Sequence, residues 1–256
     1  MKLAFIMPVP FIEEAARPLE QLHEKNFKSM VRKGTTIDIL WLKTGALEPT
    51  YSWTEAFNAI EIVKTAYRAG KKGYDGIVIG CTHDPGLIEA RSVIDVPITG
   101  VTESSALIAC SLGKRFSLIC LHEAAAAIIG EKIRRYGLAD RLASIRIAGF
   151  SSEEALNSIA NPQELTSRLT TEIANRAIRE DKAEVIIPGC TILSNILTHC
   201  QIYEIDGVPL IDPVWAGIKM AETLVDLKDS FGVGVCRRSI YAAPVNWESD
   251  ILIPED

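Results

Sequence analysis

The chain has 256 residues, of which 48% are hydrophobic and 23% are charged, a composition typical of globular proteins and unlike that of disordered or fibrous ones. Its 27 lysines and arginines against 33 aspartates and glutamates give a net charge of -6, so there is no electrostatic reason to expect nucleic acid as a partner. Six cysteines without a CxxC pair predict reduced thiols, and neither a disulfide scaffold nor a structural zinc site.

The chain opens with a short apolar run, MKLAFIMPVP, that ends in prolines. This run is well below the about 18 residues that a membrane-spanning helix needs, and it lacks a small-residue cleavage site. We interpret it as the first strand of a cytoplasmic protein that does not enter a membrane.

Short β-branched runs then alternate with longer helical patterns, which is typical of βαβ units and a mainly parallel sheet. We expect strands at 3–7, 36–42, 76–80, 97–101, 116–121, 185–188 and 209–211. We expect helices at about 11–32, 53–69, 85–94, 104–112, 123–136, 162–179 and 213–227.

An internal repeat is the clearest indication of how the chain is divided into domains. An apolar strand ends in Gly-Cys-Thr twice, at Cys81 and at Cys190, and the two copies are 109 residues apart (190 − 81). Each copy is followed by a helix and then by a second edge, DVPI at 95–98 and GVPL at 207–210. The repeated order of these features indicates duplicated halves.

The repeat predicts an α/β fold of two pseudo-symmetric lobes, each a mainly parallel sheet flanked by helices, with the active site in the cleft between them. The first lobe, 1–101 with 213–256, carries Cys81, and the second lobe, 102–212, carries Cys190. Ligands of open α/β sheets bind beyond the carboxyl ends of the strands, where both cysteines fall. The two thiols are therefore expected on opposite walls of one cleft.

Two thiols in this position suit proton transfer at a carbon centre. A thiol at a helix N-terminus is expected to have its pKa lowered towards neutrality by the helix dipole, so that it can act as a base. One thiol would remove a proton from one face of the carbon while the other donates a proton to the opposite face. The other cysteines, Cys110, Cys120, Cys200 and Cys236, lie in apolar or helical contexts typical of structural thiols.

Four segments carry a resemblance to a known family: GCTHDPGL and VPITGVTESSAL in the first half, IIPGCTILSNIL and GVPLIDPVWAGIKMAETL in the second. They resemble the aspartate/glutamate/hydantoin racemase superfamily, and the hydantoin racemase branch most. The resemblance runs from about Lys2 to Val225. It implies an isomerase, a two-cysteine racemase of an amino acid or a hydantoin-type cyclic amide, which acts without a metal, pyridoxal phosphate or any other cofactor.

Two departures leave the substrate open. Hydantoin racemases tend to have Asn-Pro-Asn after the first strand, where this chain has Met7-Pro8-Val9-Pro10, and the Asp-Ser-Gly loop of glutamate racemases is absent. The expected partner is therefore a small molecule with a carboxylate or an amide carbonyl. Alternative functions are a maleate-type cis/trans isomerase with a cysteine nucleophile, a non-catalytic two-lobed binder of a small acidic ligand, or a redox-sensing cysteine pair.

The candidate catalytic residues are Cys81 and Cys190, and the candidate substrate-binding residues are Pro8, Thr82, His83, Glu103, Thr191 and Ile192. His83 could instead be a local hydrogen-bonding group, and Glu103 could instead settle a helix start. Asp84 and Asp212, each before a proline, are interpreted as caps of the helices that follow them.

The remaining features predict no further chemistry. His23, His122 and His199 share no spacing with carboxylates or thiols that would suggest a metal site. The segment 231–235 lacks the third glycine of a dinucleotide loop. The tail from Arg237 to Asp256, with Trp247, is expected to dock on a lobe or on a neighbouring subunit of a homo-oligomer.

Overall fold

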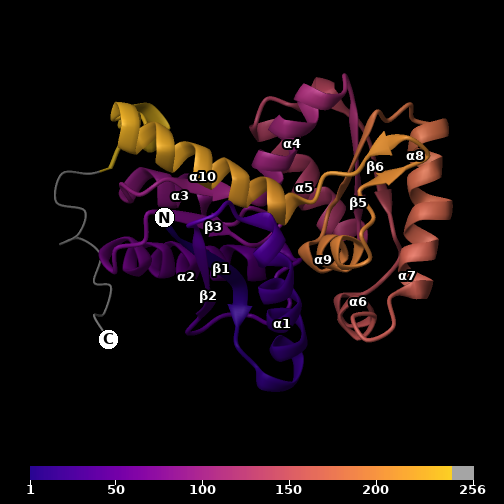
Figure 1. Cartoon of the computed structure of the whole chain (residues 1–256), viewed down its shortest axis with the longest axis horizontal. Helices are drawn as coiled ribbons and strands as arrows, with labels where there is room; N and C mark the ends of the chain where they lie inside the picture. Colours follow the sequence, from indigo (N-terminus) through magenta and orange to yellow (C-terminus); the bar gives the residue numbers. More distant parts are fainter. Residues whose placement is uncertain (244–256) are drawn as a thin grey trace.

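The computed structural model describes residues 1–243, so Trp247 and the end of the predicted tail lie outside the described residues. Two parallel sheets form separate lobes that lie side by side in Figure 1. The first sheet has the order β2-β1-β3-β4, with β1 (Lys2–Pro10), β2 (Thr36–Leu42), β3 (Gly76–Ile79) and β4 (Ile98–Gly100). The second has the order β6-β5-β7, with β5 (Phe116–Cys120), β6 (Leu142–Ile147) and β7 (Val185–Pro188). The predicted α/β fold is confirmed.

Helices connect the strands and cover the sheets. They are α1 (Glu13–Met30), α2 (Ser52–Lys71), α3 (Leu87–Val93), α4 (Val101–Leu112), α5 (Glu123–Arg135), α6 (Ser152–Asn157), α7 (Gln163–Ser167), α8 (Asn175–Arg179), α9 (Thr191–His199) and α10 (Pro213–Phe231). The helix predicted at 162–179 is α7 and α8 joined by a π-helical segment, Arg168–Ala174. The short helix α6 was not predicted from the sequence.

The two sheets repeat the same topology with one difference. Strands β1, β2 and β3 correspond in order to β5, β6 and β7, but the counterpart of β4 is reduced to a single parallel bridge between Ile186 and Leu210. The prediction of a strand of the parallel sheet at 209–211 is therefore wrong. Instead, β9 (Val208–Pro209) pairs antiparallel with β8 (Glu204–Ile205). Strand β6 was missed because Ser144 and Arg146 interrupt its apolar residues, which are only partly buried.

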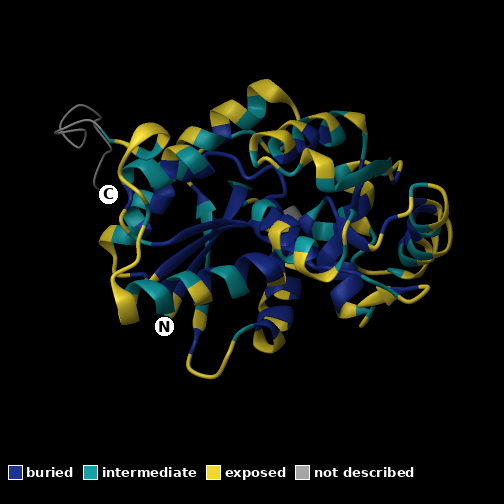
Figure 2. Ribbon diagram, turned by 90° about the horizontal axis from the view of Figure 1, so that it is seen from above, coloured by how far each residue is buried: buried dark blue, intermediate teal, exposed yellow. Residues whose placement is uncertain are grey.

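Burial explains the apolar strands that end in the repeated motif. Every residue of β3 and of β7 is buried, as expected for strands of parallel sheets that are covered by helices on both faces (Figure 2). Helix α10 returns from the second half to the first sheet, where Val214 and Ile218 pack in one cluster with Phe5 and Val78. The assignment of α10 to the first lobe, like the boundaries at 101/102 and 212/213, remains our proposal.

The two aspartates predicted as helix caps differ. Asp212 caps α10 as expected, since its Oδ1 accepts the backbone N–H groups of Val214 (2.7 Å) and Trp215 (3.2 Å). Asp84 does not cap its own helix, because the chain turns at Asp84 (φ 45°) and Gly86 (φ 72°), and α3 begins only at Leu87.

The described part of the tail contacts the first lobe. The Arg237 guanidinium donates to the Ile94 carbonyl at 2.6 Å and pairs with Asp95 at 2.6 Å. Within residues 1–243, no helix is long and apolar enough to span a bilayer.

Candidate active site

The cavity that contains both candidate catalytic cysteines, here called the cysteine cavity, has a volume of about 480 Å³. Its walls come from both halves of the chain: the end of β1, α1, the segment 47–50, the segment 81–83, the start of α5, α6 and the segment 189–192. Cys81 and Cys190 follow the buried strands β3 and β7 after one glycine, so each reaches the cavity from the carboxyl end of its strand. This is the position at which parallel α/β sheets bind ligands.

Close backbone contacts hold the two cysteine segments together. The Thr82 hydroxyl donates to the Gly189 carbonyl at 2.9 Å, and the Thr102 hydroxyl donates to the Thr82 carbonyl at 2.6 Å. At Gly189, a Cβ atom would lie 2.6 Å from Sγ of Cys120, so only glycine fits this position without a shift. The repeated Gly-Cys-Thr motif therefore joins the two halves as well as presenting the thiols.

Cys190 occupies the helix N-terminus that the sequence suggested. It is the N-cap residue of α9, and its sulfur faces the backbone N–H groups of Ile192 and Leu193. These donors favour the thiolate, but burial outweighs them and raises the pKa of Cys190 to about 11. The prediction that the helix dipole brings this thiol towards neutrality is therefore wrong for the free cavity.

Cys81 has a different environment. A turn rather than a helix follows it, and the backbone N–H of His83 donates to its sulfur. Burial raises the pKa of Cys81 above its ordinary value, and the nearby carboxylates of Asp84 and Glu55 raise it further. The expectation of a helix N-terminus at Cys81 is wrong because Asp84-Pro85-Gly86 delays the start of α3. Of the two thiols, Cys190 is the easier one to ionise.

The candidate substrate-binding residues divide into two groups. Those that line the cysteine cavity are Pro8, Thr82, His83, Thr191 and Ile192. Glu103 does not line it: both of its carboxylate oxygens accept hydrogen bonds from the Arg91 guanidinium. The prediction that Glu103 holds substrate is corrected, because α4 directs this side chain to α3 and away from the cavity.

His83 is a neutral group in this cavity. It is 2% exposed, and burial lowers its pKa to about 4, with the positive charge of Lys132 as the next cause. Its Nδ1 atom has no hydrogen-bond partner within the described residues. This nitrogen is itself buried, so it does not face the open part of the cavity, and the neutral imidazole adds no charge there.

Sequence comparison places the chain among proteins of known family. The sequence model of the family described as Asp/Glu/Hydantoin racemase matches residues 28–221. This chain belongs to that family. A hydantoin racemase of Pseudomonas sp. (strain NS671) is 32% identical over 200 residues, which cover 78% of each chain.

Solved structures extend the likeness of this racemase-family chain to nearly its whole length. An allantoin racemase from Klebsiella pneumoniae superposes with a TM-score of 0.83 at 23% identity, covering 96% of this chain and 94% of that one. An allantoin racemase from Pseudomonas fluorescens has a TM-score of 0.81 at 26% identity, with 95% and 97% covered. The resemblance seen in the sequence is thus confirmed, and the chain is an enzyme of a family of isomerases.

Sequence reasoning missed several walls of the racemase-family cavity. Trp41 closes it from the end of β2, Glu48 and Thr50 enter from the loop after β2, and Glu153 and Leu156 enter from α6. No spacing in the sequence relates these residues to either cysteine, so only the folded chain brings them together.

The charge of the cysteine cavity is informative. Among the residues that the structure describes, its lining contains two carboxylates, Glu48 and Glu153, but no lysine or arginine. Nowhere in residues 1–243, the cavity included, does a group of three or more His, Cys, Asp or Glu side chains lie so that it could hold a metal ion.

Proposed function

We propose that the chain racemises a hydantoin-type cyclic amide by proton transfer between its own two thiols, without a cofactor. The single observation that carries this proposal is that Cys81 and Cys190, on opposite halves of the chain, line one cavity. Family membership supports the racemase chemistry. The two-thiol mechanism and the substrate are the parts that need a test.

The proton inventory of the proposed reaction is simple. One cysteine thiolate removes the proton from the carbon centre of the substrate, which leaves an enolate, and the other cysteine donates its thiol proton to the opposite face. The pair ends with its protonation reversed, and the reverse reaction or exchange with water restores it. Because Cys190 ionises more easily than Cys81, we propose that the reactive form of the pair is the Cys190 thiolate with the Cys81 thiol.

The charge of the cavity favours a neutral substrate. A carboxylate substrate, such as glutamate or maleate, would enter a site whose charged side chains are two carboxylates, and no cation would offset its desolvation. A cyclic amide presents carbonyl oxygens and N–H groups instead. The N–H groups of Ile192 and Leu193 at the start of α9 could then stabilise the developing enolate oxygen.

The apolar walls indicate where the substituent of the ring would lie. Leu19, Trp41, Leu156 and Ile192 line the cavity together with the prolines at the end of β1. The segment Met7-Pro8-Val9-Pro10 stands where hydantoin racemases tend to have Asn-Pro-Asn, so this part of the wall presents hydrocarbon rather than an amide. We therefore favour a ring with an apolar substituent over allantoin, whose substituent is polar.

Deuterium exchange tests the proposal directly. Enantiopure hydantoins, allantoin, glutamate and maleate are each incubated with the enzyme in deuterated water, and optical rotation and deuterium uptake at the carbon centre are followed. We expect loss of rotation with deuterium uptake for a substituted hydantoin, and a loss of at least about 1,000-fold in Cys81→Ser and in Cys190→Ser. The matched control is Cys236→Ser, since Cys236 is exposed and does not line the cavity.

Several outcomes would reject the proposal. Full activity in either cavity variant would remove the two-thiol mechanism. Turnover of maleate, with a covalent adduct on one thiol, would favour a cis/trans isomerase instead. Binding of an acidic ligand without any exchange would favour a non-catalytic binder.

A homo-oligomer and a cytoplasmic location are also part of the proposal. Trp53, Phe57 and Ile60 are exposed on one face of α2, and such an apolar stripe suits an interface between copies. Sedimentation analysis of the wild type and of Trp53→Ser would show whether this face holds copies together.

A further inference from the structure

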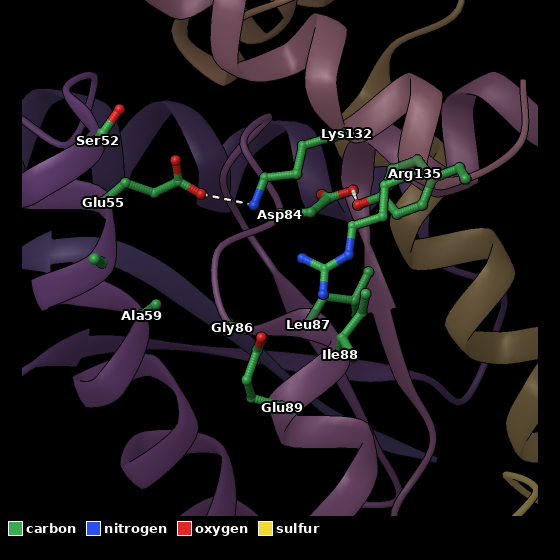
Figure 3. A pocket seen from close by; sticks show the side chains of 12 residues that line it. Ser52, Glu55, Ala59, Asp84, Gly86, Leu87, Ile88, Glu89, Lys132 and Arg135 are labelled. Carbon is green, nitrogen blue, oxygen red and sulfur yellow. Dashed lines mark hydrogen bonds and ion pairs between the residues drawn. The ribbon is translucent and has the colours of Figure 1, made fainter. Parts of the chain in front are cut away.

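A second pocket lies behind the turn that follows Cys81. It has a volume of about 240 Å³, it is lined by α2, α3, α5 and the turn, and it shares no lining residue with the cysteine cavity (Figure 3). The residues that line the cysteine cavity from this turn are Cys81, Thr82 and His83, whereas Asp84 and Gly86 line the second pocket. The turn therefore forms part of the wall of both the cysteine cavity and the second pocket.

Charges in the second pocket connect the two halves. Lys132 of α5 reaches Glu55 of α2 at 2.7 Å, and both side chains are less than one-fifth exposed (Figure 3). Asp84 is 2% exposed. Tyr136, the residue that follows α5, donates its hydroxyl to Oδ2 of Asp84 at 2.8 Å. The turn of the first half is thus tied to a tyrosine of the second half.

The other contacts of Asp84 fix the turn to a helix. Its Oδ1 accepts the backbone N–H of Thr102 at 3.1 Å, and its Oδ2 accepts that of Glu103 at 2.8 Å. These N–H groups belong to the second and third residues of α4, which has no side-chain cap of its own at Gly100. Asp84 also holds a positive φ of 45°, which costs a non-glycine residue free energy unless the surroundings compensate it.

Comparison of the two halves shows that this arrangement is not required to cap a helix. Aligning the Val-Pro pairs at 96–97 and 208–209 makes Gly100 the counterpart of Asp212, and Asp212 caps its own helix. In the first half, a Cβ at position 100 would lie 2.4 Å from Cγ of Asp84, so glycine leaves the space that the Asp84 carboxylate occupies. In the first half, the residue that caps the helix therefore lies in the turn after Cys81 and not directly before the helix.

We propose that Asp84 is a positioning residue for Cys81, which it holds against α4 and, through Tyr136, against the second half of the chain. The proposal rests on the proposed role of Cys81 in proton transfer. Asp84 does not touch substrate, because it faces the second pocket. It fixes the backbone from which the His83 N–H donates to the Cys81 sulfur, and hence the place of the thiol opposite Cys190.

The decisive variant is Tyr136→Phe, which removes one hydroxyl, and its matched control is Tyr74→Phe. Tyr74 donates to Asp38 at 2.9 Å, a tyrosine–aspartate bond of the same kind that does not line the cavity. We expect Tyr136→Phe to lower kcat about tenfold or more while KM changes less than about threefold, because a small displacement of a proton donor slows the chemical step. Tyr74→Phe should change neither constant.

A second measurement does not depend on turnover. Alkylation of Cys81 and Cys190 by iodoacetamide is followed at fixed pH by peptide mass spectrometry in the wild type and in Asp84→Asn. Loss of the Asp84 charge should speed the reaction of Cys81 relative to Cys190 by about threefold or more, since that charge opposes the Cys81 thiolate. In the same variant kcat should fall, so Cys81 would react faster with iodoacetamide while the enzyme turns over more slowly.

The results separate the two proposals. A kcat of Tyr136→Phe within twofold of the wild type, or an unchanged Cys81 to Cys190 alkylation ratio in Asp84→Asn, would overturn the positioning role. If Tyr136→Phe does not fold, kcat and the alkylation ratio of Asp84→Asn decide. If the wild type racemises none of the compounds tested but the alkylation ratio changes as expected, the influence of Asp84 on the Cys81 thiol stands and the proposed function fails.

Discussion

The raised pKa of Cys190 leads to a specific prediction for the pH dependence of kcat/KM. With a pKa of about 11, roughly one Cys190 in a thousand is a thiolate at pH 8, which corresponds to a cost of about 4 kcal/mol. Below that pKa the thiolate fraction rises tenfold for each pH unit. If the Cys190 thiolate is the base, kcat/KM should rise about 100-fold between pH 7 and pH 9.

The assay is the initial loss of circular dichroism of an enantiopure substituted hydantoin at a concentration far below KM. The rate in buffer alone is subtracted at each pH, and a thermal melt confirms that the protein stays folded. His83 should add no step to the profile, because its pKa of about 4 keeps it neutral throughout this range. The rate of Cys190 alkylation should rise in parallel with kcat/KM.

A flat profile from pH 7 to pH 9, with the protein folded throughout, would refute the reasoning. It would mean either that Cys190 is already ionised at pH 7, against the burial seen here, or that a group other than this thiol removes the proton.

Three further predictions follow from single side chains. Glu103→Gln should leave kcat and KM within about twofold, because Glu103 does not line the cavity. The same change should lower the free energy of unfolding by about 1–3 kcal/mol, because it weakens the ion pair with Arg91. A large rise in KM would instead show that Glu103 binds substrate. Gly80→Ala should lower the free energy of unfolding, measured by urea titration, by about 1–3 kcal/mol, since its Cβ would lie 2.3 Å from the Phe5 ring. The control Gly234→Ala, whose Cβ would have no atom within 4 Å, should leave the stability nearly unchanged. Equal values for the two variants would contradict this packing argument. Trp41→Ala should raise KM about tenfold for a hydantoin with a bulky apolar substituent and little for one with a methyl group, and equal effects on both would show that the substituent lies elsewhere.

The alternation of strands and helices could be predicted because it depends on local patterns. Strands β1, β2, β3, β5 and β7 lie close to their predicted ranges, since each is a short, mainly apolar run. Strand β6 was missed because its run LASIRI is interrupted by Ser144 and Arg146 and carries a weaker pattern. The bridge at Leu210 could not be distinguished from a full strand, because pairing depends on where the partner strand ends.

Apart from Pro8 at the end of β1, the candidate site was predictable only where the chain repeats itself. Two copies of Gly-Cys-Thr after apolar strands were enough to select Cys81 and Cys190 and the residues next to them in sequence. The error at Glu103 has the opposite origin: its neighbourhood looked like a strand end, but the direction of a side chain on α4 depends on how that helix packs, and it packs so that Glu103 meets Arg91.

The sequence by itself determined the fold class, the duplication and the two thiols, because hydrophobic periodicity and a repeated motif are properties of the chain read in order. Only the tertiary structure decided the ionisation of those thiols, since burial and nearby carboxylates raise their pKa values against the effect of a helix terminus. It also decided that Asp84 caps α4 rather than its own helix, and that the cavity has carboxylates but no cation. These properties depend on distances between residues far apart in the chain, which no local pattern specifies.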